Sequence, residues 1–409
     1  MTVPVAEPIA ARHGGADAKP QALQGALSLG LGVFGVGLIN TAVLNTFPFL
    51  AGGLIDGRGM SATEAGLLIS AELLVSALVA LALSRPSLNL APRSLGLAGC
   101  CLFAVGGLMA ANAGGHALIA ARLLAGAGEG VALAAGGRAL AMAPSPARLS
   151  ARVAVALAVF GTMLALGAGL VVAAGGYSRG CFYLAAVGML GAGLSLFIPR
   201  THGRRTSADP SGEPKAYNWP AAIPIIGAAG LMFLSAGAIW NFSERIGLQA
   251  GLTPAAVAAT IAFTSLAGVV GGAVAVAMAR LGRDFLVVGA GAVVFGGSVA
   301  TLALATGPLQ YAAALSVLSF AFVFVGPFIL SIAVRIDASG GLAGAAQGAQ
   351  MLAGAVAPFI GGLLLSKGSF RALAVLAAVT SALSVASLIA AHRRSPRPTG
   401  RAGTAEPSR

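Results

Sequence analysis

The sequence is poor in charged residues. Only 9% of its 409 residues are charged and 57% are hydrophobic, whereas a soluble domain carries about 25% charged residues. The mean hydropathy is +0.90. A soluble domain covers its surface with charged and polar side chains, so this composition excludes an ordinary soluble domain. A protein surrounded by lipid needs no such cover.

Cysteine, histidine and nucleotide-binding motifs are also scarce or missing. Cys100, Cys101 and Cys181 lie in apolar stretches without metal-ligand spacing, so we interpret them as small apolar fillers. The four histidines lie in tails, loops or span ends, which argues against a buried haem or zinc site. No P-loop is present, which excludes ATP as the energy source, and no Ser/His/Asp cluster indicates hydrolysis. We therefore expect no enzyme, no cofactor and no metal.

Twelve stretches are long and apolar enough to cross a bilayer. In hydrocarbon the backbone must satisfy its own hydrogen bonds, and runs of about 20 apolar residues indicate helices rather than barrel strands. The sequence therefore predicts an all-α polytopic membrane protein. Its spans are expected at 26–50, 64–84, 94–112, 117–139, 152–174, 180–198, 220–244, 254–278, 285–305, 309–333, 342–365 and 371–391.

The basic residues predict the orientation. If both termini are cytoplasmic, 19 of the 25 Lys and Arg residues fall on the inner side, and only Arg58, Arg179, Lys367 and Arg371 fall outside. This bias favours the inner (plasma) membrane of a bacterial-type cell, with both ends of the chain in the cytoplasm. It also explains the net charge of +13 through attraction to an anionic inner leaflet, so we expect no nucleic-acid partner.

The chain divides into two halves. Residues 201–219 are rich in Pro, Gly and charge and are expected to form a cytosolic linker. A weak repeat at an offset of about 192 residues relates 57–70 to 249–262, each with a Ser or Thr that starts the next helix. Two six-helix bundles with a site between them are typical of secondary transporters. The expected parts are a tail (1–25), a first bundle (26–200), the linker, a second bundle (220–392) and a tail (393–409).

Three short motifs and this layout resemble the major facilitator superfamily over residues 20–392. Leu118–Gly128 (LIAARLLAGAG) resembles the fourth-helix pattern of the family, with Arg122, Gly126 and Gly128 in place. Ala279–Arg283 (ARLGR) resembles the end of the family's loop signature. Ala355–Gly362 (AVAPFIGG) carries the Pro-x-x-Gly-Gly turn that is typical of the eleventh helix.

The same segments also depart from the family pattern. The loop after the second span, SRPSLNLAPRS, has lost the Gly-x-x-x-Asp-Arg form, and Ala279 replaces an Asp. The fifth span lacks the Gly-Pro pair of many drug/proton antiporters. These departures leave the subfamily open.

Ionisable side chains at membrane depth cost about 2.5–3.5 kcal/mol or more, so each is a functional candidate. Glu72 lies in the second span, and Glu129 and Arg122 lie about 10 Å apart on one face of the fourth. A carboxyl group in a medium of low dielectric has a raised pKa, and a nearby guanidinium lowers it again. Glu129 or Glu72 is therefore predicted to couple transport to protons, with Arg122 as modulator. A static ion pair is the alternative.

The remaining candidates are polar and aromatic residues of three spans. In the resemblance, the first and seventh helices line the solute cavity, which nominates Asn40, Asn45, Trp240 and Asn241. Pro48 leaves a backbone carbonyl of the first span unpaired. The end of the seventh span is interpreted either as an interfacial anchor or as a gate or substrate cluster. The further candidates are Phe242, Glu244, Arg245, Gln347 and Gln350, for which helix–helix hydrogen bonding is the alternative role.

Together these features predict a monomeric secondary transporter that moves a small organic solute by alternating access, coupled to protons. One alternative is efflux of drug-like compounds by proton antiport. Another is a non-transporting membrane sensor or lipid-handling protein on the same scaffold.

Overall fold

The computed structural model describes residues 18–84, 88, 90–200, 219–278, 284–336, 341–367 and 370–394, and every element in them is a helix. The helices are α1 (Ala18–Arg58), α2 (Ala62–Leu83), α3 (Pro92–Asn112), α4 (Gly115–Leu140), α5 (Pro146–Ser195), α6 (Trp219–Trp240), α7 (Ser243–Gln249), α8 (Pro254–Met278), α9 (Asp284–Ala303), α10 (Pro308–Ile336), α11 (Gly341–Ser366) and α12 (Phe370–Arg394).

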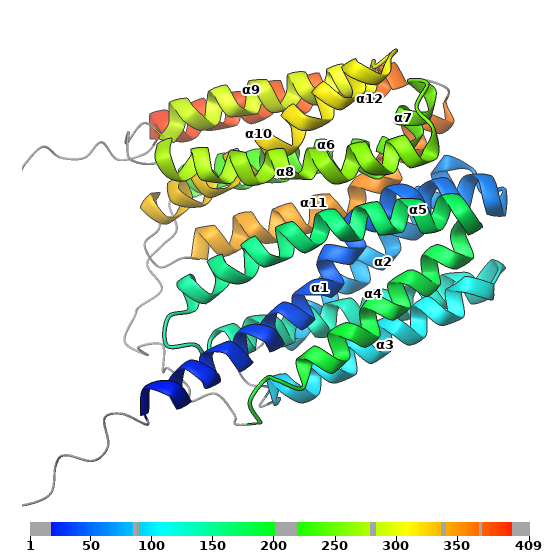
Figure 1. Ribbon diagram of the computed structural model, residues 1–409. Helices are drawn as coiled ribbons and strands as arrows, with labels where there is room; N and C mark the ends of the chain where they lie inside the picture. The colour runs from blue at the N-terminus through cyan, green and yellow to red at the C-terminus, as the bar shows by residue number, and fades with distance from the viewer. Residues whose placement is uncertain are drawn as a thin grey trace, which may run out of the picture.

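Eleven of these helices are long and apolar enough to span a membrane, counted over the described residues. One of them, α5, is two helices that meet at a sharp kink at Gly175 and Gly176. Gly176 has φ of +68°, a left-handed conformation that suits glycine. Figure 1 shows the chain reversing direction at this point. Eleven helices therefore supply twelve crossing segments, and the predicted all-α polytopic fold is confirmed.

The helices form two bundles that lie one above the other in Figure 1. Helices α1–α5 pack around one hydrophobic cluster and α6–α12 around a second. Ser61 starts α2 with a capping box in which its side chain and Glu64 satisfy each other's backbone. Proline begins α3, α5, α8 and α10, where its missing N–H costs nothing.

Two predicted spans have other boundaries in the structure. The first span was expected at 26–50, but α1 runs from Ala18 to Arg58. Pro20 lies in its first turn, where proline is tolerated. The helix continues through Pro48 because the side chain of Trp240 satisfies the carbonyl that this proline frees. The seventh span was expected to reach residue 244, but α6 ends at Trp240 and the short α7 follows. Asn241 donates its side-chain amide to the Gly237 carbonyl, so its side chain competes with the helix ladder at that point.

The bundles are joined at one end of the molecule. We name this the α7 end, because it holds α7, the α1–α2 turn and the α5 kink. The opposite end, where the described chain begins at Ala18 and finishes at Arg394, is the termini end. In Figure 1 the bundles lie close together at the α7 end, and their ribbons separate toward the termini end. The joining helices are α2 with α11, α5 with α8, and α1 with α7.

Candidate functional site

A buried ion pair links α2 and α4 inside the first bundle. The Arg122 guanidinium contacts the Glu72 carboxylate, and the two side chains are 3% and 0% exposed. The two helices approach closely because Gly126 packs directly on Glu72: a Cβ atom at Gly126 would overlap the Glu72 carbonyl oxygen. Glu72, on the neighbouring helix, is therefore the partner of Arg122.

Glu129 completes this group of charges, which we call the buried triad (Glu72, Arg122 and Glu129). Its side chain is 1% exposed, and its charged neighbours are Glu72 and Arg122, with the Ser76 hydroxyl beside its carboxyl. One Glu129 oxygen has no hydrogen-bond partner among the described residues, nor does one Arg122 nitrogen. The triad thus places two acids around one guanidinium, with polar atoms left to be satisfied.

The environment of Arg122 is otherwise aromatic and weakly polar. Its guanidinium lies 5.6 Å from the centre of the Phe47 ring on α1, and Tyr177 and Cys181 of α5 are near enough to interact with it electrostatically. Tyr177 in turn lies under Arg58 at 5.4 Å. Arg58 donates to the Ala111 and Ala113 carbonyls at the end of α3. Helices α1, α3, α4 and α5 are therefore held together around the triad as one unit.

A second group of polar contacts crosses between the bundles at the α7 end. The indole N–H of Trp240 donates to the Leu44 carbonyl at 2.7 Å. Leu44 lies four residues before Pro48, which has no N–H to donate back, so its carbonyl is the one that the proline frees. Trp240 therefore lets α1 pass through Pro48 and joins α6 to α1.

Charged residues reinforce this contact. Arg245 on α7 pairs with Asp56 on α1 at 2.6 Å, and Glu244 packs on Gly52 of α1. Burial raises the pKa of Glu244 to about 7, with Arg245 opposing and Asp56 reinforcing the rise. One Glu244 oxygen is buried without a hydrogen-bond partner.

Helices α2 and α11 meet at the same end through small residues. A Cβ atom at Gly362 would overlap the Ala62 carbonyl, and one at Gly66 would overlap the Pro358 carbonyl. The Ser70 hydroxyl accepts a bond from the Phe359 N–H at 2.9 Å. Among the residues that the structure describes, the hydrogen bonds and the ion pair that join the bundles thus lie at the α7 end. We call these contacts the α7-end closure.

The other predicted residues are more scattered. Asn45 and Asn241 donate their amides to carbonyls of their own helices, Thr41 and Gly237. Asn40 is partly exposed on α1. On α11, Gln347 is exposed and Gln350 is buried. Phe242 is fully buried within the hydrophobic cluster of the first bundle, so it packs across the bundles and does not line an open cavity.

Sequence reasoning missed several residues of these groups. Asp56 was not considered because it lies near a span end, where an acid is unremarkable. Ser76 is a small polar residue of a type that is common in helices, but its position one turn after Glu72 was a usable signal. The described residues hold no group of three or more His, Cys, Asp or Glu that could bind a metal.

With this geometry in hand, comparisons with known proteins decide the family. A family model described as Major Facilitator Superfamily matches residues 29–358. The chain belongs to the major facilitator superfamily. This confirms the resemblance carried by the Arg122–Gly128 and Ala355–Gly362 motifs. None of the curated proteins searched matches the chain in sequence.

Solved structures of superfamily transporters share the fold. A bacterial homologue of the human lysosomal transporter Spinster, inward-facing and unoccupied, aligns with a TM-score of 0.71 at 12% identity, covering 93% of this chain and 99% of that one. A mutant of the peptide transporter POT gives 0.68 at 13%, covering 91% and 95%. A mutant of the nucleoside transporter NupG gives 0.65 at 14%, covering 90% and 99%. At these identities the likeness shows the fold alone.

Proposed function

We propose that the protein is a secondary active transporter that moves a small organic solute across the plasma membrane by alternating access, coupled to protons. The observation that carries this proposal is the α7-end closure. Two bundles that touch at one end, through contacts that can break one by one, suit a solute path that opens at either end in turn. A static scaffold would not need such a division.

The closure supports a defined starting state for the cycle. With both termini cytoplasmic, as the basic residues favour, the α7 end is the outer end and the path is closed to the outside. Two structures of the Spinster homologue, titled inward-facing, align with TM-scores of 0.71 and 0.64, which supports an inward-facing state here. Opening outward then requires the Trp240–Leu44 and Arg245–Asp56 contacts to break.

The buried triad supports proton coupling. Its two acids share one guanidinium, so the group is electrically neutral when it holds one proton, and low-dielectric surroundings favour neutrality. A proton that arrives on one acid releases Arg122 toward the other. Because Glu72 lies on α2, which carries the closure, and Arg122 and Glu129 lie on α4, this exchange changes the contact between two helices of the bundle.

The solute is proposed to contact side chains between the bundles, with Gln347 exposed and Asn40, Asn45 and Trp240 partly buried. Asn241 and Gln350, which are buried, would serve if the helices rearrange. A screen of metabolites and drug-like compounds by thermal unfolding of the purified protein, at two pH values, would identify a solute, because binding to the folded state raises its stability.

The proton-coupling proposal is tested with the solute so found, in proteoliposomes. We expect Glu72→Gln and Glu129→Gln to abolish accumulation driven by a proton gradient while retaining exchange of labelled for unlabelled solute. The control is Glu64→Gln, an exposed acid on the same helix whose capping role glutamine preserves. Undiminished gradient-driven accumulation in both triad variants would contradict proton coupling through the triad.

A further inference from the structure

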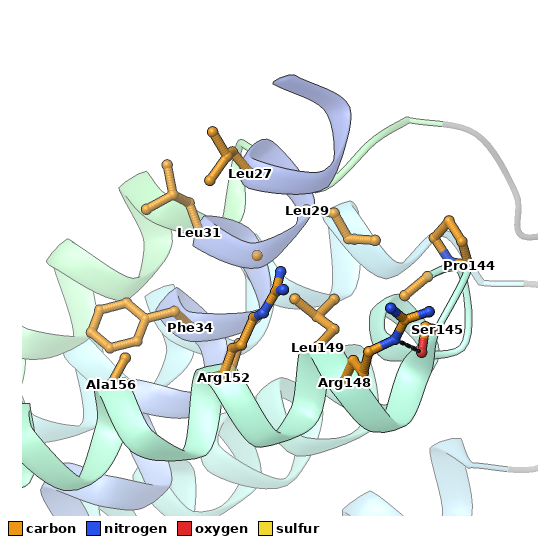
Figure 2. A pocket seen from close by; sticks show the side chains of 13 residues that line it. Leu27, Leu29, Leu31, Phe34, Pro144, Ser145, Arg148, Leu149, Arg152 and Ala156 are labelled. Carbon is orange, nitrogen blue, oxygen red and sulfur yellow. Dashed lines mark hydrogen bonds between the residues drawn. The ribbon is translucent and has the colours of Figure 1, made fainter. Parts of the chain in front are cut away.

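A cavity of about 540 Å³ lies at the termini end between α1 and the start of α5. Its walls are mostly apolar and include Leu27, Leu31 and Leu149, and its polar side chains include Arg148 and Arg152. Figure 2 shows Arg152 reaching from α5 toward α1, and Arg148 beside Ser145, to which it donates at 2.9 Å. The cavity is distinct from the buried triad and from the α7-end closure.

The charge of this cavity is one-sided. Arg148 and Arg152 are four residues apart, so their guanidiniums share one face of α5 and repel each other unless an anion lies between them. The described residues that line the cavity include no acid, and neither arginine takes part in an ion pair with the described part of the chain. The cavity therefore offers two cationic groups and an apolar wall to an anionic partner.

The same face of α5 continues as an apolar stripe. Val159, Met163 and Leu170 lie within about 60° of the two arginines around the helix and are 49%, 62% and 45% exposed. From Arg152 to Leu170 the stripe extends about 27 Å, close to the thickness of the bilayer's hydrocarbon core. A water-soluble anion would leave this stripe uncovered, whereas an acyl chain of one leaflet, which reaches through about half of the hydrocarbon core, would cover its first part, Val159 and Met163.

We propose that this cavity is a binding site for an anionic phospholipid of the leaflet at the termini end. The phosphate lies between Arg148 and Arg152, and an acyl chain follows Val159 and Met163. Basic pockets between transmembrane helices bind anionic headgroups by the same physics. Since the site requires only that the helices span a bilayer, it stands independently of proton coupling and of the identity of the solute.

The test counts bound lipid on the purified full chain by native mass spectrometry, during titration with phosphatidylglycerol or phosphatidylcholine. We expect one phosphatidylglycerol to bind about tenfold more tightly than phosphatidylcholine, and the double variant Arg148→Gln/Arg152→Gln to lose this preference. The matched control is Arg93→Gln/Arg200→Gln, which removes equal charge at the same end but outside the cavity. It should bind as the wild type does.

A second variant tests the cavity without changing charge. A side chain at Gly30 would meet only the tip of Leu149, so Gly30→Leu should fill the cavity, keep the fold and weaken phosphatidylglycerol binding severalfold. Equal loss in the Arg93/Arg200 control would overturn the proposal in favour of general charge attraction. Displacement of the lipid by millimolar inorganic phosphate would overturn it in favour of a free-anion site, and normal binding to Gly30→Leu would place the lipid elsewhere.

Discussion

Helices α2 and α4 of the first bundle correspond to α8 and α10 of the second. Both pairs pack closely through a glycine, but within the described residues only the first pair holds buried charged residues. In the first pair, Gly126 lies on the backbone of Glu72, and in the second, Gly271 lies on the backbone of Phe320. At the repeat offset of 192 residues, Glu72 corresponds to Thr264, which is 7% exposed and bonds only within its own helix. Close packing of these helices therefore does not require charge.

This difference bears on the role of the triad. Every buried charged residue among those that the structure describes belongs to the first bundle. Burying an ion pair usually contributes little net stability, but breaking it leaves an uncompensated charge. The comparison therefore favours a functional role for the triad over a structural one.

The largest effect is expected from breaking the pair itself. Glu72→Leu should lower the free energy of unfolding by about 3–5 kcal/mol, because Arg122 stays charged and buried but loses the carboxylate that it contacts. Glu72→Leu/Arg122→Leu should regain most of that loss, since two apolar side chains replace both charges. Thr264→Val in the second bundle should cost less than about 1 kcal/mol. Denaturant unfolding in detergent measures all three, and a double variant as unstable as the single would show that the pair holds the bundle together.

A steric change should disrupt the closure next. Gly362→Leu places a side chain where the Ala62 carbonyl lies, so α2 and α11 cannot meet and the α7 end should remain open. Solute transport should fall at least tenfold, while Gly348→Leu on the same helix, where no atom lies within 4 Å, should transport normally. Accessibility of Ser243→Cys, a nearly isosteric change at a position that is buried in the closed end, to a water-soluble thiol reagent reports the opening. Unchanged accessibility in Gly362→Leu would contradict the closure.

The pH dependence of the closure should follow Glu244. Its pKa is about 7 when buried against Gly52, above its ordinary value of 4.5, so the closed end is favoured by the protonated form. The groups facing Glu244 are Asp56, Arg245 and Tyr311. Closure should be strongest below about pH 4.5, weaken as the pH rises through 7, and be flat above. The Ser243→Cys assay repeated in Glu244→Gln should lose this dependence; an identical pH profile in that variant would exclude Glu244 as its source.

The smallest effect is that of one hydrogen bond. Trp240→Phe removes the donor to Leu44 and should weaken the closed state by about 1 kcal/mol, or roughly fivefold in population. Asp56→Asn should do less, because that ion pair is partly exposed and such pairs contribute 0–1 kcal/mol. The same accessibility assay ranks the two variants. A larger effect for Asp56→Asn would show that the Arg245–Asp56 ion pair, and not the Trp240–Leu44 hydrogen bond, contributes more to the closed state.

Much of the fold could be predicted from the sequence because each membrane span is a run of about 20 apolar residues, which composition alone reveals. Twelve crossing segments and the break between the fifth and sixth spans followed from hydropathy, and the charged residues at membrane depth were selected by the energetic cost of burying charge. The partners of those residues did not follow, because they depend on helix packing. Either Arg122 or Glu129 could have contacted Glu72, and the way in which α2 packs on α4 brings Arg122 to it.

The closure was the least predictable feature. Pro48 indicated a freed carbonyl, but nothing in the sequence indicated that Trp240, on the other bundle, would satisfy it. For the same reason the end of α1 was misplaced at residue 50. Phe242 shows the converse: an aromatic residue expected to line a cavity is buried because the bundles meet around it. The hydrogen bonds between the bundles join residues 189 to 303 positions apart in the chain, and local sequence patterns do not indicate such pairs.

The central claim is that the two ends open in turn, and distances between spin labels test it most directly. One pair, Gly57→Cys and Gln249→Cys, spans the α7 end, and another, Ala151→Cys and Ala277→Cys, spans the termini end; all four positions are exposed, and Cys101 is replaced by Ala. In bilayer nanodiscs we predict that Gly362→Leu lengthens the first distance and shortens the second. Both distances changing in the same direction, or neither changing, would contradict alternating access.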